Sequence, residues 1–442
     1  MKHNTNILSF TKSRSRKTAS IKDVLHELLR FKEVKLFVYP SVPDVTISSV
    51  IISKLIDRNV RLAVKVKPLI KSSDIKGETI ISLGIPLSKN IINILNKYAK
   101  GGYLIGLCSK ELRSYGKNIP FLKCIENHEP LATAVWQLFK ETYDHLDYIL
   151  TLSSIFAHNF FKYPKSMIEE MFLSECVSRD ILDRVKSLRV AGVNYKPLYK
   201  ALACSLIPFF FGISGSFIEA EKFLRTHGIV DLSAKLIEHD PTKIKEIVED
   251  LLKVANKVRE NAWKIEDLIG ETYSLKKKMF KEISNDVLEL SIVLDTVVEM
   301  YGLEKSVFLK EQFSSFLKTI GPTYFSIVKK LGKIVDAIQE AGLRELEVNG
   351  RIMKILPPIN MDKIPYYILE SLLLTAGFID YEDVFIVDHR RTLLLPYTTI
   401  RRVFGEYSCN VLEKFTKKAS GEKAYGLTFR ALRDIIECLR EV

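Results

Sequence analysis

The sequence predicts an α/β fold in three parts: an N-terminal domain built on a parallel sheet, a helical middle region and an α+β C-terminal domain. Three observations lead to this fold class. Apolar strands alternate with helices between residues 34 and 107, which is typical of a parallel sheet. A helical stripe of apolar residues follows from residue 244, and short strands mixed with helices occupy the end of the chain.

Short apolar runs separated by polar turns identify the N-terminal elements. The predicted helices are Ile21–Phe31, Ile47–Ile56 and Ser88–Lys100. The predicted strands are Val34–Val38, Val60–Val66, Thr79–Leu83 and Gly102–Leu107. Leu25, Leu28 and Leu29 share one face of the first helix, and Ser88 is placed to cap the last one. The carboxyl ends of these strands are expected to face one crevice.

The middle region begins with a helix-start signal. Asp240 is placed as the N-cap and Pro241 as the first helical residue. Apolar residues then recur at helical spacing, at Ile244, Ile247, Leu251, Val254 and Val258. This stripe predicts core packing, whereas the outer face of the region is predicted to dock a partner. Trp263 is the aromatic residue to test there, because tryptophan is enriched at the centres of interfaces.

The C-terminal elements are shorter. Strands are predicted at Val384–Val387, Thr392–Leu395 and Tyr425–Phe429, and a closing helix at Leu432–Leu439. The predicted division of the chain is a basic disordered arm over residues 1–20, the parallel-sheet domain over 21–190, a helical connector or insertion over 191–285 and the C-terminal domain over 286–442.

Composition sets the outer limits of the function. The chain has 442 residues, of which 47% are apolar and 27% charged, and this excludes a disordered or fibrous protein. No apolar run reaches the roughly 18 residues that span a bilayer, so we expect no membrane partner and a cytoplasmic, nucleoid-associated protein. The cysteines are predicted to be buried thiols in a reducing compartment, because they show no metal-ligand spacing: Cys108, Cys124, Cys176, Cys204, Cys409 and Cys438.

The net charge of +13 suggests an anionic partner, and the excess is unevenly distributed. Residues 1–20 carry five lysine or arginine residues and no acid. Between residues 390 and 423 there are eight basic and three acidic residues. The residues predicted to bind nucleic acid in this second segment are Arg390, Arg391, Arg401, Arg402, Lys417, Lys418 and Lys423. The alternative is a solvated basic face, so the DNA binding predicted here is weak and sensitive to salt.

Several clusters of polar residues resemble catalytic sites only in part. Asp388-His389-Arg390 is interpreted as a structural group in the C-terminal domain. Asp144, His145 and Asp147 are placed at a helix start, where acids interact favourably with the helix dipole. Gly212–Ser216 is interpreted as a tight turn, because no strand precedes it as in an esterase elbow. His128 and Glu129 are assigned to a loop before Pro130.

The turn within Tyr39–Leu55 carries the strongest functional signal. It resembles the metal-binding turn T-H-x-D-x-D-G-x-x-S-A of the DHH phosphoesterase superfamily, which includes the RecJ single-strand exonucleases, and places Val42, Asp44 and Val45 at the aligned positions. The later motifs of that superfamily fall on equally altered residues. They correspond to Ser82 in the second motif, to Gly106, Leu107 and Cys108 in the Asp-His-His motif, and to His158 in the fourth motif.

The segment Lys196–Ile229 is similar to the archaeal branch of RecJ-like proteins, with its Lys-Pro-Leu opening and its Gly-x-Ser-Gly turn. This resemblance implies an N-terminal DHH-type domain and a C-terminal DHHA-type domain. In the latter, Lys417–Gly426 occupies the place of a glycine-rich DNA-binding loop and retains Gly421. In active relatives the first domain holds two Mn²⁺ ions.

The altered motif positions argue against catalysis. Two divalent ions about 4 Å apart repel each other by roughly 16 kcal/mol at an effective dielectric constant near 20, so they need several converging carboxylates. Asp44 is the one carboxylate left at the motif positions. We therefore predict no catalytic residues, no metal and no cofactor, and a protein that is not an enzyme.

The resemblance then implies a catalytically degenerate subunit of an archaeal replicative DNA helicase. This subunit is similar to eukaryotic Cdc45 of the CMG complex and bridges GINS and the MCM ring, with single-stranded DNA as a further partner. Two alternatives stay open. One is a divergent Mn-dependent exonuclease acting 5′ to 3′ on single strands. The other is a nucleotide or cyclic-dinucleotide phosphodiesterase or sensor.

Overall fold

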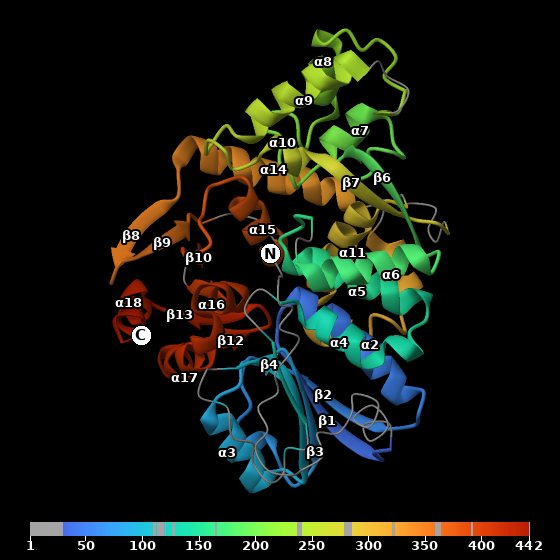
Figure 1. The fold of residues 1–442 in the computed structure, drawn as a ribbon. Helices are drawn as coiled ribbons and strands as arrows, with labels where there is room; N and C mark the ends of the chain where they lie inside the picture. The colour runs from blue at the N-terminus through green and yellow to red at the C-terminus, as the bar shows by residue number, and fades with distance from the viewer. Residues whose placement is uncertain are drawn as a thin grey trace, which may run out of the picture.

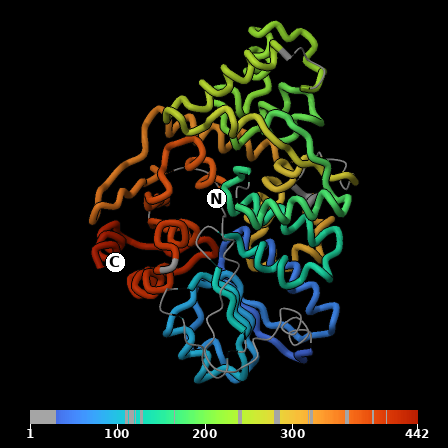
Figure 2. The backbone as a smooth tube through the Cα atoms, viewed as in Figure 1, coloured from blue at the N-terminus to red at the C-terminus, as the bar shows by residue number. Residues whose placement is uncertain are grey.

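The computed structural model describes residues 30–108, 112, 119, 121–125, 129–163, 166–236, 241–277, 285–320, 323–358, 364–389 and 392–441. The predicted arm and nearly all of the helix predicted over residues 21–31 lie outside these residues. Three groups of elements follow one another, and the red C-terminal group returns to lie beside the blue N-terminal sheet (Figure 1). Figure 2 shows the same path, with the green and yellow helical region at the far end of the molecule.

The N-terminal domain is built on a five-stranded sheet with the order β2-β1-β3-β4-β5. All of its strand pairs are parallel, as predicted. The strands are β1 (Glu33–Val38), β2 (Arg61–Val66), β3 (Thr79–Leu83), β4 (Gly101–Leu107) and β5 (Phe121–Ile125). β5 was not predicted, because its short sequence FLKCI mixes polar and apolar residues.

Helices cover both faces of this sheet. α2 (Val42–Ile56) and α4 (Leu131–Phe139) pack on one face, and α3 (Lys89–Tyr98) packs on the other. α5 (His145–His158) packs on α2 and α4, and α6 (Met167–Ser178) packs on α4. Short 3₁₀ turns are η1 (Ser72–Asp74) and η2 (Lys140–Thr142). Ser88 caps α3 as predicted, and its side chain accepts a hydrogen bond from the Ile91 amide. α2 begins at Val42, earlier than the predicted Ile47, because Ser41 caps it and a proline fits its first turn.

The middle region is less purely helical than predicted. Its elements are α7 (Leu198–Ala203), α8 (Phe217–Thr226), α9 (Pro241–Ala255), α10 (Ile265–Leu268) and β7 (Ile269–Leu275). β7 pairs with β6 (Leu182–Leu188) to form an antiparallel ribbon that links this region to the end of the first domain. α9 begins at Pro241 as predicted, and the apolar stripe packs inward with Ile247 and Leu251 buried. Asp240 lies outside the described residues.

The helix α11 (Val287–Tyr301) runs through the centre of the molecule and contacts α2, α5 and α15 (Tyr366–Thr375). It is followed by α12 (Leu303–Ser306), α13 (Phe313–Ile320) and α14 (Tyr324–Ala341). Nearly all of α11 is buried, including the acidic residues Glu289, Asp295 and Glu299. The three parts of the chain therefore share one interior.

The C-terminal domain contains a six-stranded mixed sheet with the order β12-β13-β11-β10-β9-β8. Its strands are β8 (Arg344–Val348), β9 (Arg351–Leu356), β10 (Val384–Asp388), β11 (Leu393–Pro396), β12 (Gly421–Lys423) and β13 (Gly426–Phe429). Its helices are α16 (Tyr397–Phe404), α17 (Ser408–Lys418) and α18 (Leu432–Arg440), with a 3₁₀ turn η5 (Gly405–Tyr407). The predicted strands match β10, β11 and β13 to within one residue at each end, and the predicted α/β fold class is confirmed.

Two apolar clusters hold these parts together. The larger one packs α2, α4, α5 and α11 against one face of the parallel sheet. The second joins the other face of that sheet to the C-terminal domain, and it includes Phe37 of β1, Leu104 of β4, Tyr397 of α16 and Phe415 of α17. Because the two sheet domains share this cluster, the carboxyl edge of the parallel sheet faces α16.

Candidate functional site

The altered motif positions gather at the carboxyl edge of the parallel sheet. Val38 of β1 pairs with Leu83 of β3, which pairs with Ile105 of β4, so the turns that follow these strands start side by side. Asp44 lies in the first turn of α2, just after β1. Gly84, just after β3, lies so close to it that a Cβ atom added there would be 2.7 Å from Asp44 Oδ2.

Local structure holds the Asp44 side chain in place. The Ser41 hydroxyl donates a hydrogen bond of 2.7 Å to Asp44 Oδ2 and accepts one from the Asp44 amide. A carboxylate in the first turn of a helix also interacts favourably with the helix dipole. Gly84 adopts a φ of +73°, a backbone conformation that glycine adopts without strain. Local sequence therefore explains why this carboxylate points along the sheet edge.

A cation from the C-terminal domain neutralises Asp44. The Arg401 guanidinium on α16 donates to Asp44 Oδ2, and the two side chains are only 11% and 2% exposed. The Arg401 guanidinium also lies over the Tyr39 ring, 5.3 Å from its centroid. The Tyr39 hydroxyl donates to the carbonyl oxygen of Tyr397 at 2.8 Å. These contacts join the turn after β1 to α16.

Burial raises the pKa of Asp44 above its ordinary value, and Arg401 and Ser41 oppose that shift. The cause is desolvation, which disfavours a charged carboxylate away from water. A nearby guanidinium favours the charged form, so the ion pair offsets part of this desolvation. Arg401 therefore favours the charged form of Asp44 against the effect of burial.

The residues at this edge do not fit a pair of Mn²⁺ ions. Mn²⁺ prefers oxygen ligands, and several carboxylates are needed to hold two ions. Val42 and Leu107 are buried and apolar. Gly106 leaves no room for an aspartate, because even a Cβ atom there would lie 2.2 Å from the Ile85 carbonyl oxygen. Among the residues that the structure describes, no three His, Cys, Asp or Glu side chains are grouped as a metal site.

Ser82 and His158 complete the predicted positions. Ser82 is buried in β3, and its hydroxyl has no hydrogen-bond partner within the described residues. His158 is the last residue of α5 and is half-buried. The segment around it docks on α15 instead, because the Tyr367 hydroxyl donates to the Ala157 carbonyl oxygen at 2.5 Å. The structure thus brings Asp44 close to the end of β3, but its partner is Arg401.

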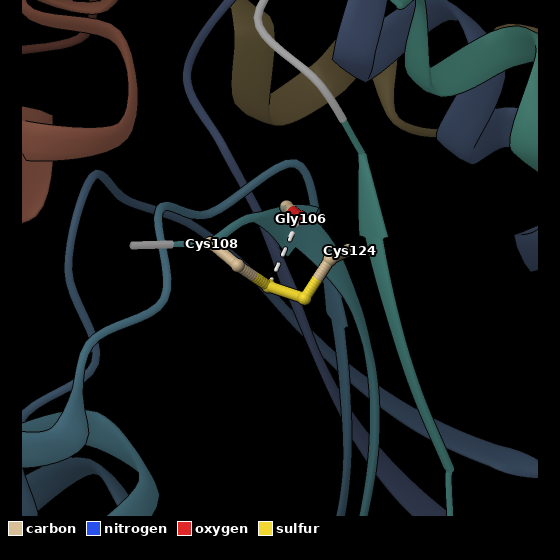
Figure 3. Close-up of a disulfide and its surroundings, with 3 residues drawn as sticks. All are labelled: Gly106, Cys108 and Cys124. Carbon is tan, nitrogen blue, oxygen red and sulfur yellow. Dashed lines mark hydrogen bonds between the residues drawn. A yellow bond between two sulfur atoms is a disulfide. The ribbon is translucent and has the colours of Figure 1, made fainter. Parts of the chain in front are cut away.

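Cys108 corrects the expectation of free thiols. Cys108 and Cys124 form a disulfide, with their Cα atoms 5.4 Å apart (Figure 3). The pairing follows from the register, because Gly106 of β4 lies opposite Cys124 of β5. The remaining four cysteines are free as predicted, three of them buried and Cys204 partly exposed. The disulfide links Cys108, at the third motif position just after β4, to the neighbouring strand β5.

Two of the predicted DNA-binding arginines also require correction. Arg402 is buried, and its guanidinium donates to Glu370 Oε1 at 3.0 Å and to the Asp383 carbonyl oxygen at 2.9 Å. Arg401 is engaged with Asp44. Both arginines are therefore internal cations rather than part of an exposed basic face.

The other predicted basic residues differ in accessibility. Lys417 and Lys423 are exposed. Lys418 is partly buried and pairs with Glu437 at 3.0 Å and with Glu441 at 3.2 Å. Arg390 and Arg391 lie outside the described residues. Among the predicted DNA-binding residues that the structure describes, Lys417 and Lys423 are therefore the exposed ones.

The other polar clusters are structural, as interpreted from the sequence. Asp144 and Asp147 form a capping box at the start of α5, and Asp147 binds the amino groups of Lys54 at 2.7 Å and Lys310 at 2.6 Å. The Tyr366 hydroxyl lies 2.5 Å from Nε2 of His389, whose pKa is lowered mainly by burial.

The Gly212–Ser216 segment is a turn, as predicted. The Ser214 hydroxyl accepts a hydrogen bond from the Phe210 amide at 3.0 Å, and Ser216 caps α8. His128 lies outside the described residues.

The sequence did not lead us to predict that the side chains of Arg401 and Trp263 point into the protein interior. Helical spacing offered a signal for Arg401, because it lies four residues after Tyr397 and three before Phe404, both buried. Trp263 was predicted at a partner interface, but it is buried and its indole donates to the Thr375 carbonyl oxygen at 2.8 Å. It therefore anchors the middle region to α15.

No protein-family model and no curated protein matches the sequence. Solved structures do match. CDC45 from Entamoeba histolytica has a TM-score of 0.61 at 11% identity, over 96% of this chain and 98% of that one. An exonuclease RecJ bound to manganese has a TM-score of 0.44 at 7% identity, over 96% and 93% of the two chains.

RecJ from Thermus thermophilus in complex with Mn²⁺ has a TM-score of 0.43 at 6% identity, over 96% of this chain and 53% of that one. The likeness to CDC45 confirms the predicted Cdc45-like fold across nearly the whole chain. Among the described residues, no helix has the length and apolar character to cross a membrane.

Proposed function

We propose that the protein is a non-catalytic RecJ-fold subunit of the archaeal replicative DNA helicase assembly, in which it bridges GINS and the MCM ring. The observation that carries this proposal is the Arg401 guanidinium on Asp44, where a metal-dependent relative would need a cation held by carboxylates. The Cdc45-like fold supports the same assignment. Such a subunit works in the cytoplasm, at the nucleoid.

Physical chemistry explains why this ion pair opposes catalysis. A divalent ion on Asp44 Oδ2 would have to displace the Arg401 guanidinium, which donates to that oxygen. Breaking a buried ion pair by removing one partner costs about 3–5 kcal/mol. The neighbouring positions Val42, Gly106 and Leu107 have no carboxylate that would offset this cost. A metal-activated water is therefore not expected at this edge.

The contacts between the two sheet domains suit a bridging subunit. Tyr39 binds Tyr397, and the Asn90 amide donates to Glu413 Oε1 at 2.8 Å. The shared apolar cluster lies behind these contacts. A nuclease needs an open crevice for its strand, whereas a bridge needs surfaces at fixed relative positions. The observed packing favours the bridge over an exonuclease or a phosphodiesterase.

A nuclease assay tests the loss of catalysis. End-labelled single-stranded DNA is incubated with Mn²⁺ and either the wild-type protein or Asp44→Asn, which keeps the side-chain shape. We expect no degradation by either protein and no change in the electron paramagnetic resonance signal of free Mn²⁺. Degradation that disappears in Asp44→Asn would establish an exonuclease instead.

A reconstitution experiment tests the bridging role. The full chain is mixed with purified GINS and MCM at roughly 0.15 M salt, where the screening length is about 8 Å. We expect a ternary complex on size-exclusion chromatography. If the protein binds neither GINS nor MCM alone or together, the bridging role is wrong.

A further inference from the structure

An aromatic cluster with a basic border lies where α7, α8 and α14 meet, far along the chain from Asp44. The rings of Phe217 and Phe325 stack with centroids 4.0 Å apart and planes inclined by 14°. The Tyr199 ring meets Phe217 edge-on at 6.1 Å. All three side chains are only partly buried. We call this cluster, together with Ile218, the aromatic shelf.

The aromatic shelf includes a strongly exposed aliphatic side chain, that of Ile218, which is unusual for a surface that contacts only water. Its side chain is 66% exposed beside Phe217 in the first turn of α8. The loop before α8 rests directly on α14, because a Cβ atom added to Gly215 would lie 3.5 Å from Lys329 Cα. The shelf is therefore held on closely packed backbone. A firmly placed group of partly exposed rings and an exposed isoleucine is typical of an interaction surface.

Lysines border the shelf without acidic partners. Lys200 Nζ lies 5.8 Å from the centroid of the Tyr199 ring. Lys329, Lys330 and Lys333 are exposed along α14, and none of the ion pairs among the described residues involves these four lysines. The acids nearest to the shelf are Asp336, one turn after Lys333 on α14, and Glu219, which follows Ile218 on α8 and pairs with Lys222 at 2.7 Å. The lysines around the shelf outnumber these acids, so the local charge is positive.

We infer that the aromatic shelf docks an acidic segment of a partner protein, with one aromatic or aliphatic side chain seated on Ile218 and Phe217. The lysines supply the complementary charge and the rings supply the apolar contact. Nucleic acid fits less well, because stacking of bases needs free ring faces and the stacked Phe217 and Phe325 rings each already have one face covered by the other. The inference rests on the proposed function only in taking the partner to be a protein.

A peptide selection on the full chain tests this inference. A phage-displayed library of random dodecapeptides is selected on the wild-type protein, and the enriched peptides are synthesised with a fluorescent label. Their affinities are then measured by anisotropy for Ile218→Ser, for Lys329→Glu/Lys333→Glu and for a control, Lys97→Glu/Lys100→Glu. The control makes the same charge change at two exposed lysines of the first domain.

We expect enriched peptides with Asp or Glu around one aromatic or aliphatic residue. Their affinity should fall about tenfold or more in both shelf variants and less than about twofold in the control, as expected when a central apolar or charged group of an interface is removed. The inference is wrong if no peptide is enriched, if the enriched peptides lack acids, or if the shelf variants bind them like wild type.

A second measurement distinguishes a surface that binds nucleic acid from one that docks a protein. If Lys329→Glu/Lys333→Glu loses affinity for a labelled thymidine oligonucleotide but keeps the peptides, the shelf binds DNA and the inference is overturned. Failure of the wild-type protein to bind GINS and MCM would end the proposed function but leave the peptide result standing. The two ideas can therefore fail separately.

Discussion

The Arg401 guanidinium reaches Asp44 across 357 residues of sequence and joins the first turn of α2 to the first helix after the C-terminal β11. Asp44 stands at the carboxyl edge of the parallel sheet and has an arginine as its cation. The pair is a largely buried contact between the two sheet domains. Its consequences for stability and binding can be measured.

Removal of one member of this pair should destabilise the protein. Arg401→Met leaves a buried carboxylate without its cation, so we expect a loss of about 3–5 kcal/mol in the free energy of unfolding. Asp44→Asn/Arg401→Met should lose less than the sum of the two single variants, because they are coupled. Urea unfolding gives all three values. Lys222→Gln, which removes an exposed ion pair with Glu219, serves as a control and should leave the transition unchanged.

Gly84 offers a steric test of the same site. In Gly84→Ala the new methyl group would meet Asp44 Oδ2 at 2.7 Å and would also require alanine at a φ of +73°. Gly77→Ala is the matched control, because its φ is +82° and nothing lies within 4 Å of the added atom. We expect about 1–2 kcal/mol of destabilisation for the control from the left-handed backbone alone, and clearly more for Gly84→Ala. If Gly84→Ala and Gly77→Ala lowered the free energy of unfolding equally, a methyl group at position 84 would not clash with Asp44.

The buried carboxyl group of Glu299 should make the stability of the folded protein depend on pH. Burial raises the pKa of Glu299 to about 8, even though its carboxylate accepts a hydrogen bond of 2.7 Å from the Tyr367 amide. The folded protein therefore keeps a proton that the unfolded chain releases near its ordinary pKa of 4.5. The stability this proton contributes is complete below pH 4.5 and is lost as the pH rises towards 8.

Glu299→Gln should remove this dependence. Relative to wild type, the variant should gain stability between about pH 5 and about pH 9, by at most about 5 kcal/mol at 1.36 kcal/mol per pKa unit. Urea unfolding at both pH values measures the change. Parallel pH curves for the two proteins would mean that Glu299 is charged in the fold.

Substitution of exposed basic residues of the C-terminal domain should weaken DNA binding, whereas substitution of a buried one should destabilise the fold. Lys417→Gln/Lys423→Gln removes two exposed cations. The slope of log affinity against log salt for single strands should therefore fall by about 0.7 for each phosphate that is no longer neutralised. Arg402→Met should instead destabilise the fold by about 3–5 kcal/mol, because Glu370 would remain buried without its cation.

Anisotropy of a labelled thymidine oligonucleotide and urea unfolding provide the two measurements. An unchanged salt slope in the lysine variant would exclude Lys417 and Lys423 from DNA contact. A salt slope that fell in Arg402→Met while the fold stayed intact would place that arginine at the surface.

Much of the fold was predictable because its elements follow local rules. Ser88 and Pro241 mark helix starts by capping and by restricted φ, and both act within one turn of helix. Most strands of the parallel sheet are short apolar runs, so their positions along the sequence could be predicted. β5 and the β6–β7 ribbon were missed, because their side chains alternate poorly and their pairing depends on partners distant in sequence.

The sequence by itself determined which chemical groups stand at the sheet edge: one carboxylate at Asp44, with Val42, Ser82 and Gly106 beside it in the motif positions. It could not determine what neutralises that carboxylate. Tertiary structure alone decided that Arg401 pairs with Asp44, that Arg402 pairs with Glu370 and that Cys108 meets Cys124. The physical reason is that periodicity and capping act over a few residues, whereas an ion pair between domains depends on how the whole chain packs.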